Sequence, residues 1–179
     1  MGGIRRIGRA QPLLDTAQRL PMRNLVSLVL VETLGIAIIL GSSRLLAGEL
    51  NVIHSLLIAP MVSFVLIVAQ PHLPGSRPVR VLAAYALVGI IGIGLSTAPW
   101  SMTIRGIIAT AVTLFFMYLL GVFHAPAFGV PLSAILIGFE LVDAPRAYLV
   151  LMTYTVIVLL LAFATNRLLG FRSYPERWW

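Results

Sequence analysis

The sequence predicts an all-helical integral membrane protein with a single transmembrane domain. Of its 179 residues, 59% are hydrophobic and 11% are charged, and the mean hydropathy is +0.99. An ordinary soluble domain has about 25% charged residues, so this chain is too apolar for that class. Two further observations support the prediction: four apolar runs each approach the roughly 17 to 25 residues that a helix needs to cross a bilayer, and prolines interrupt two shorter apolar runs.

The four long runs are predicted to be transmembrane helices, with a few residues of slack at each end. They comprise residues 25–41, 81–95, 104–121 and 147–169.

The two shorter runs are predicted to be short, kinked or re-entrant helices. Residues 52–69 contain Pro60, and residues 127–141 contain Pro131. Irregular backbone is tolerated at membrane depth only where it is buried in protein or lines a cavity, so these runs point to an internal site.

The order of the runs, long-short-long followed by long-short-long, predicts two pseudo-repeats at about residues 24–97 and 102–170. The step Ala59-Pro60 in the first repeat corresponds to His124-Ala125-Pro126 in the second. If both short segments cross the membrane, the halves have three crossings each and are inverted. If the short segments only dip into the membrane, the halves are parallel.

Charge predicts the orientation of the chain. The net charge is +7 and all 13 basic residues are Arg, which lie mainly at the ends of apolar runs. The positive-inside rule then places both termini in the cytoplasm, in the inner membrane of a bacterial-type cell. We expect a basic cytoplasmic arm at 1–23, a transmembrane domain at 24–170 and a cytoplasmic or interfacial tail at 171–179.

Several kinds of chemistry have no support in the sequence. The absence of Cys excludes disulfides, thiolate metal sites and cysteine nucleophiles. No pair of histidines has metal-ligand spacing, and no P-loop, zinc signature or Gly-x-Ser-x-Gly motif occurs. We therefore expect no cofactor, no metal and no enzymatic activity.

Two ionisable residues inside or beside apolar runs are candidates for proton coupling or for a structural role. Glu32 is the only carboxylate well inside a long run, where a charge costs about 2.5 kcal/mol or more. It is predicted to carry a proton, or to fix packing through an ion pair with Arg44 or Arg105. His54 lies near the start of the first short helix.

The segments around the two Ala-Pro steps are candidates for a substrate site. A helix that starts there offers unpaired N–H groups and a positive dipole end, which favour a small anion. His124 is predicted to hydrogen-bond an anion or to change charge near neutral pH, or else to be a satisfied cap. The alternative for the Gly and Ser positions is close helix packing. The candidate substrate-binding residues are Pro60, Ser63, His124, Pro126, Ala127, Gly129 and Ser133.

Three segments resemble the HPP family of integral membrane proteins, which is named for a His-Pro-Pro motif. FHAPAFGVPLSAIL resembles the family signature, NRLLGFRSYPERWW its ending, and APMVSFVLIVAQPHLPGSRPVR its earlier proline-containing segment. By position, His124 and Pro126 match the first and last motif residues, and Ala127 matches the small residue that follows. Ala125 stands in place of the middle proline and Phe128 in place of an expected glycine.

This resemblance spans about residues 25–179 and implies four transmembrane helices and transport of a small anion, since some members are linked to nitrite. The first short segment carries Met61, Val62 and Phe64 where the family has small residues, which favours another substrate.

We expect a secondary permease for a small anion such as nitrite, with proton coupling as an option. The alternatives are a non-transporting membrane scaffold or assembly protein, and a handler of anionic lipid phosphates. The expected partners are membrane lipids, the small anion and further copies of the chain, without nucleic acid.

Overall fold

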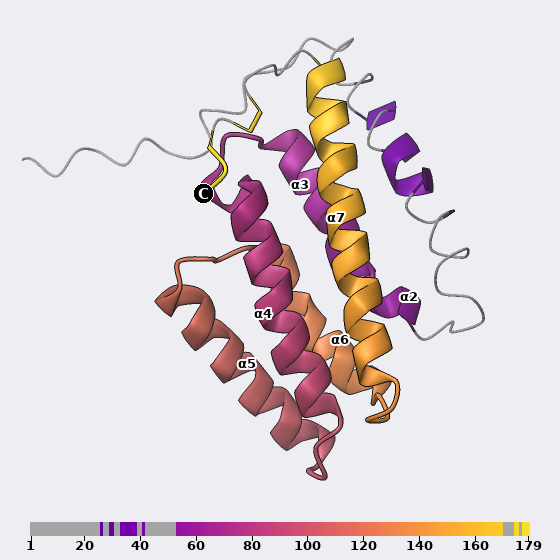
Figure 1. Ribbon diagram of the computed structural model, residues 1–179, viewed down its shortest axis with the longest axis vertical. Helices are drawn as coiled ribbons and strands as arrows, with labels where there is room; N and C mark the ends of the chain where they lie inside the picture. The colour runs from indigo at the N-terminus through magenta and orange to yellow at the C-terminus, as the bar shows by residue number, and fades with distance from the viewer. Residues whose placement is uncertain are drawn as a thin grey trace, which may run out of the picture.

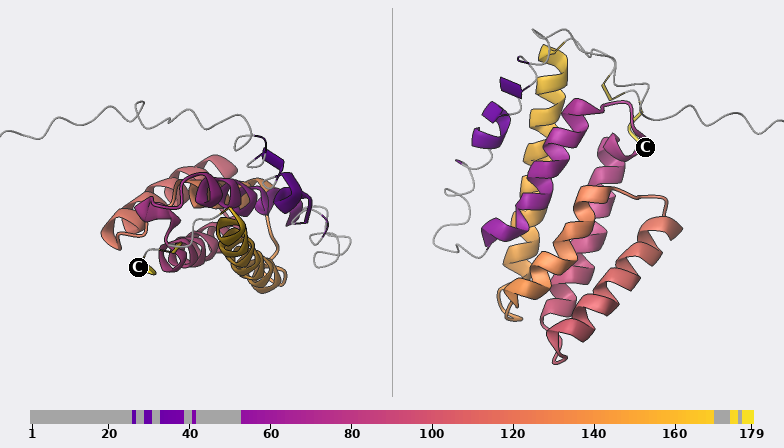
Figure 2. Two further views of the ribbon diagram at one scale, coloured as in Figure 1. Left: turned by 90° about the horizontal axis from the view of Figure 1, so that it is seen from above. Right: turned by 180° about the vertical axis from the view of Figure 1, so that it is seen from behind.

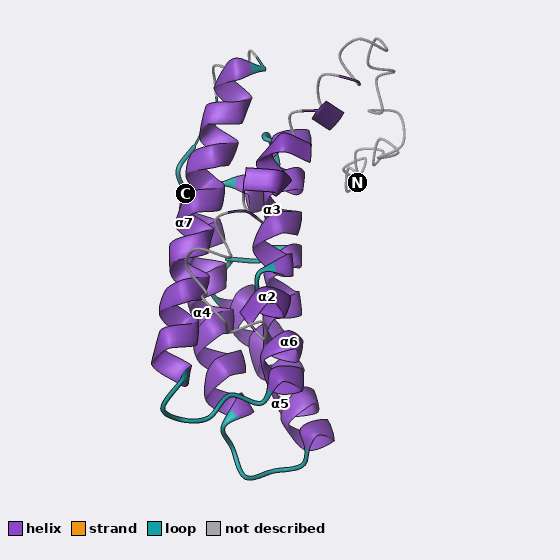
Figure 3. Ribbon diagram, turned by 90° about the vertical axis from the view of Figure 1, so that its right-hand side faces the viewer, coloured by secondary structure: helices purple, strands orange, loops and turns teal. Residues whose placement is uncertain are grey.

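The computed structural model describes residues 26, 29–30, 33–38, 41, 53–169, 174–175 and 177–179. Within these residues the regular structure is entirely helical (Figure 3). The elements are α2 (Ile53–Leu56), α3 (Ile58–Ala69), the 3-10 helix η1 (Pro74–Ser76), α4 (Pro78–Ser96), α5 (Met102–Leu119), the 3-10 helix η2 (Ala125–Phe128), α6 (Gly129–Ile137) and α7 (Ala144–Leu168).

In the described part of the chain, three helices are long and apolar enough to cross a membrane: α4, α5 and α7. They confirm the predicted spans at 81–95, 104–121 and 147–169 to within a few residues at each end. The two predicted short segments correspond to α3 and to η2 with α6, which are shorter apolar helices. Of the run at 25–41, residues 33–38 are described and helical, so a fourth span and the complete repeat remain predictions.

The prolines of the short segments lie in first turns, and at Pro60 and Pro131 the helical path is interrupted: α2 ends at Leu56 just before α3, and η2 ends at Phe128 just before α6. Pro60 is the third residue of α3, Pro126 is the second residue of η2, and Pro131 is the third residue of α6. Proline is tolerated in a first turn because the N–H groups there have no partner within the helix. Gly138 ends α6 with φ of 70°, the left-handed conformation common at helix C-termini.

From α3 to α7 each helix runs in the opposite direction to the one before it, with η2 and α6 forming one descending segment (Figures 1 and 2). Helix α4 is central and packs against α5, α6 and α7, while α3 packs against α7 and η2. Loops 70–77 and 120–124 lie at one end of the bundle together with residues 174–175 and 177–179, and we call this end the tail end.

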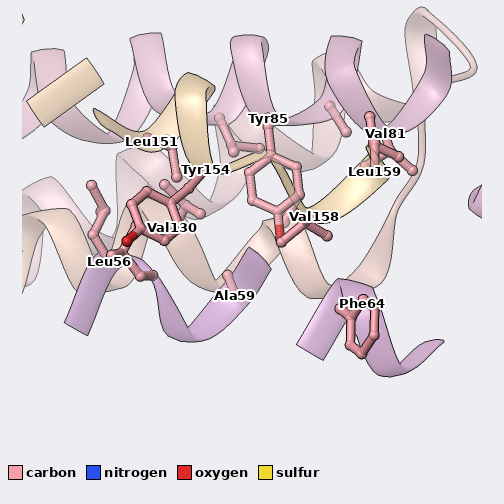
Figure 4. Packing of buried hydrophobic residues seen from close by; sticks show 14 of the residues in the cluster. Leu56, Ala59, Phe64, Val81, Tyr85, Val130, Leu151, Tyr154, Val158 and Leu159 are labelled. Atoms are coloured by element: carbon pink, nitrogen blue, oxygen red, sulfur yellow. The ribbon is translucent and has the colours of Figure 1, made fainter. Parts of the chain in front are cut away.

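The core lies between α3, α4, α6 and α7. Figure 4 shows part of it, with Leu56 from α2, Tyr85 from α4, Val130 from α6 and Tyr154 from α7, all of which are fully buried. The first apolar run also contributes, because a Cβ atom on Gly35 would lie 2.3 Å from the ring of Phe64 in α3.

Helix α5 is the most exposed of the long helices. Its buried residues, Ala109, Thr113 and Met117, form one stripe at helical spacing. Large apolar side chains such as Ile107 and Phe115 are exposed on the remaining surface. In a bilayer this surface is covered by acyl chains, which suits an apolar helix with little protein around it.

Candidate functional site

His124 is the most deeply buried charged or imidazole side chain in the described part of the chain, with 1% of its surface exposed. It is the residue before η2 and has an extended backbone conformation. Its Nδ1 lies 2.8 Å from the carbonyl oxygen of Gly75 in η1, and its Nε2 lies 2.7 Å from Ser63 Oγ in α3. The side chain therefore joins three segments that are distant in the sequence.

Ser63 connects His124 to a second helix. Its Oγ also lies 2.7 Å from Tyr85 Oη in α4 and 3.1 Å from the carbonyl oxygen of Ala59. Ser63 and Tyr85 are fully buried, and the rings of Tyr85 and His124 are 5.9 Å apart. We call Ser63, Tyr85 and His124, with the carbonyls of Ala59 and Gly75, the His124 network.

The directions of these hydrogen bonds follow from what each group can donate. A carbonyl only accepts, so Nδ1 of His124 donates to Gly75. In a neutral ring Nε2 then carries a lone pair and accepts from the hydroxyl of Ser63. The remaining lone pairs of Ser63 Oγ accept from the hydroxyl of Tyr85.

Burial decides the charge of the imidazole. It lowers the pKa of His124 to about 4, against the smaller opposing effect of the hydrogen bond to Gly75. The ring is therefore neutral at pH 7, and both of its nitrogens are engaged by protein atoms.

A cleft of about 390 Å³ opens beside the network at the tail end. Among the described residues that line it, Arg80 is the only charged one, and it is half-buried. Its Nε is buried and has no hydrogen-bond partner in the described part of the protein. The other lining residues are Leu66, Leu73, Pro74, Gly75, Ser76, Met117, Tyr118, Gly121, Phe123, His124 and Ala125.

The C-terminal residues hold the turn that carries Gly75. Ser76 Oγ donates to the carbonyl of Gln70 at 2.8 Å, and the hydroxyl of buried Tyr174 donates to the carbonyl of Ser76 at 3.0 Å. The N–H of Val79 donates to the carbonyl of Trp178 at 3.1 Å. The last described residues thus fix η1 and the start of α4. Because Gly75 in η1 accepts from His124, they also help to position the His124 side chain.

A second cleft, of about 270 Å³, lies on the same end of the bundle. Arg77 and Arg177 line it together with His72, and Arg77 Nη1 also donates to the carbonyl of Trp179 at 2.9 Å. None of the described residues that line it is acidic.

The structure brings two of the predicted site residues, Ser63 and His124, into direct contact. Pro60 and Ala127 are buried near them in sequence, and Pro126 is half-buried. Gly129 is exposed, with nothing within 4 Å of the place that a Cβ would take.

Of the predicted site residues that the structure describes, only His124 lines the cleft. Ser133 is half-buried in α6 and does not line it. Glu32 and the side chain of His54 lie outside the described residues.

Sequence reasoning missed Tyr85, Gly75 and the position of Arg80. Tyr85 did carry a signal, because a hydroxyl inside an apolar span needs a partner when it is buried. Arg80 was interpreted as an orienting charge at a helix end, and in the lipid-phosphate alternative as part of the arginine-rich face, but not as a residue beside His124. Gly75 contributes a backbone carbonyl, for which no side-chain pattern exists.

Comparison with known proteins gives a family. The family model described as the HPP transmembrane region matches residues 17–175. No curated protein and no solved structure matches the chain. Because the family model covers most of the sequence and the helices are membrane-spanning in length and composition, the chain belongs to the HPP transmembrane family and is an integral membrane protein.

Proposed function

We propose that the protein is a secondary permease for a small monovalent anion, with nitrite as the first candidate. The observation that carries this proposal is the guanidinium of Arg80, half-buried in a cleft that leads to the His124 network. Apart from Arg80 the cleft is lined by neutral side chains, and a cation in such surroundings attracts an anion more strongly than one in water.

In this proposal Arg80 recruits the anion and His124 closes the inner end of the cleft. Both ring nitrogens are engaged by Gly75 and Ser63, so His124 does not donate a hydrogen bond to the anion in this arrangement. It acts here as a gate. Glu32 and His54 remain candidate proton carriers, on the sequence argument alone.

The course of the helices supports an inverted repeat as the framework of the permease. Helices α3 and α6 run in opposite directions (Figure 2), as expected if the two short segments belong to inverted halves. The first apolar run would complete the first half, and it packs on α3 through Gly35.

Charge supports a cytoplasmic tail end in a bacterial-type inner membrane. The described Arg residues at the tail end are Arg77, Arg80, Arg167 and Arg177. The opposite end carries Glu140 and Asp143 as well as Arg105 and Arg146. This asymmetry follows the positive-inside rule.

The test is uptake of nitrite, nitrate, formate and chloride, each measured separately and in competition, into proteoliposomes, with protein-free liposomes as the blank. We expect saturable uptake that falls at least tenfold in Arg80→Ala. Arg146→Ala is the matched control, because it removes an exposed arginine at the opposite end. Absence of flux for all four anions in folded protein, or equal flux in Arg80→Ala, would refute the proposal. Absence of flux would favour the scaffold alternative.

A second candidate function, the handling of anionic lipid phosphates, is favoured by the second cleft. Arg77 and Arg177 line this cleft. Trp178 and Trp179, which follow Arg177 in the chain, are exposed, and such rings favour the membrane interface. Lipid mass spectrometry of the purified protein tests it. Retained phosphatidylglycerol that is lost in Arg177→Ala, together with absent anion flux, would favour this candidate over the permease.

A further inference from the structure

The His124 network is complete in two protonation states. In the neutral state, Tyr85 donates to Ser63, Ser63 donates to Nε2 of His124, and Nδ1 donates to Gly75. In this state the hydroxyl of Ser63 does not donate to the carbonyl of Ala59, which lies 3.1 Å from Ser63 Oγ.

The protonated state uses the same atoms in the same places. An imidazolium donates from both nitrogens, so Nε2 now donates to Ser63 Oγ. A hydroxyl has one hydrogen and two acceptor sites, which match its three neighbours. Ser63 accepts from His124 and Tyr85 and turns its own hydrogen to the carbonyl of Ala59.

The other neutral tautomer is disfavoured by Gly75. A proton on Nε2 alone would leave the lone pair of Nδ1 facing the carbonyl oxygen of Gly75 at 2.8 Å. Two acceptors at that distance repel each other, so the neutral ring keeps its proton on Nδ1 and offers Nε2 as the basic atom.

We propose that His124 and Ser63 form a proton-binding site, in which uptake of one proton at Nε2 turns the hydroxyl of Ser63 from His124 to the carbonyl of Ala59. The lone pair of Nε2 forms the new N–H bond, and the proton comes from water in the adjoining cleft. Oxidation state does not change, and the only covalent bond that breaks is the O–H bond of the donating water or hydronium.

The surroundings of His124 favour the neutral ring. Among the described residues, the titratable or charged side chains that contact His124 or share its cleft are Tyr85 and Arg80 from α4 and Tyr118 from α5, and loop 70–77 also carries His72 and Arg77, which line the second cleft. Helices α3, η1, η2 and α6 carry none, and Tyr174 approaches only through Ser76. Burial opposes protonation, and the hydrogen bond to Gly75 offsets part of that effect.

An anion in the cleft would offset the charge of Arg80 and favour the imidazolium. By linkage, the proton would raise the affinity for the anion by the same factor. This coupling rests on the proposed function, whereas proton binding itself does not. With the coupling, the permease is a proton–anion symporter.

The test is ¹⁵N NMR of histidine-labelled protein in nanodiscs, with His54→Gln and His72→Gln leaving His124 as the single histidine. Above pH 7 we expect a protonated Nδ1 and a bare Nε2, and on acidification one step that protonates Nε2. Ser63→Ala should lower the midpoint by about one pH unit, because the imidazolium loses its acceptor. Ser63→Thr, which keeps the hydroxyl, should preserve the midpoint.

A neutral ring that carries its proton on Nε2 would overturn the inference, and so would equal midpoints in Ser63→Ala and Ser63→Thr. The tautomer is measured in protein that keeps Ser63, so this measurement tests the inference even if Ser63→Ala does not fold. Proton binding as described, without nitrite-coupled proton entry into proteoliposomes, would keep the proton site and remove the symport, whereas absence of anion uptake would remove the permease.

Discussion

Gly92 of α4 lies directly against Pro131 of α6: a Cβ atom on Gly92 would stand 2.5 Å from Pro131 Cα. The obstructing atom belongs to the backbone of a short helix, so it cannot turn aside as a flexible side chain would. Small residues at such crossings let membrane helices approach closely. The contact joins the central helix to the segment that follows His124.

Gly92→Ala is therefore expected to destabilise the protein. Overpacking of a close contact costs about 1 to 3 kcal/mol, and the helix preference of Ala offsets only about 1 kcal/mol. Thermal unfolding of purified protein in detergent should show a lower midpoint.

Gly94→Ala is the matched control, since it lies two residues away on the exposed side of the same helix, with nothing within 4 Å of its Cβ position. We expect its midpoint to equal or exceed that of the wild type. Equal midpoints for the two variants would contradict the close contact.

Stability should fall in mild acid because of His124. Its pKa is about 4 in the folded protein and about 6.5 in an unfolded chain. Between these pH values the unfolded state binds more protons, so stability is constant above about pH 6.5 and is lost as the pH decreases toward 4. The full effect of this one group is about 3 kcal/mol.

His124→Gln should flatten this acid response, because an amide can still donate to Gly75 and accept from Ser63 but does not titrate. The measurement is the unfolding midpoint from pH 8 to pH 4, with His72→Gln as a control on an exposed loop residue. An unchanged acid slope in His124→Gln would show that other groups dominate.

Tyr174→Phe should loosen the turn that orients His124. It removes the hydroxyl that donates to the carbonyl of Ser76 at 3.0 Å, at a cost of about 1 kcal/mol. Hydrogen exchange of loop 70–77 should become faster in this variant. Tyr118→Phe makes the same chemical change at an exposed position, and we expect no change there. Equal protection of the loop in wild type and Tyr174→Phe would count against a role for the tail.

The long helices could be predicted because their signal is local. Apolar length alone predicted α4, α5 and α7, and the capping of α5 by Ser101 and the proline at the start of α4 only adjusted the boundaries. The prolines of the short segments were more ambiguous, since the same residue either kinks a helix or begins one. In the structure Pro60 and Pro131 do both, since one helical segment ends just before each of them and α3 or α6 begins there.

The candidate site was predictable only in part, because its bonds join distant segments. His124 and Ser63 were selected separately, each for lying beside an Ala-Pro step. Their contact spans 61 residues of sequence, and the one between Ser63 and Tyr85 spans 22. Such pairings depend on how α3, α4 and loop 120–124 pack together, and no spacing in the sequence encodes them.

Thr113→Val should stabilise the protein, in contrast to most substitutions in a core. The side chain is fully buried in α5, and its Oγ1 has no hydrogen-bond partner among the described residues. A buried hydroxyl without a partner costs about 1 to 3 kcal/mol, and valine has nearly the same shape without that group. We expect a higher unfolding midpoint for Thr113→Val. Thr155→Val is the comparison, because Thr155 Oγ1 donates to the carbonyl of Leu151 at 2.9 Å and its loss should lower the midpoint. If Thr113→Val is instead the less stable of the two, its hydroxyl must be bound by water or by a ligand on the α5 stripe that leads from Met117 in the cleft.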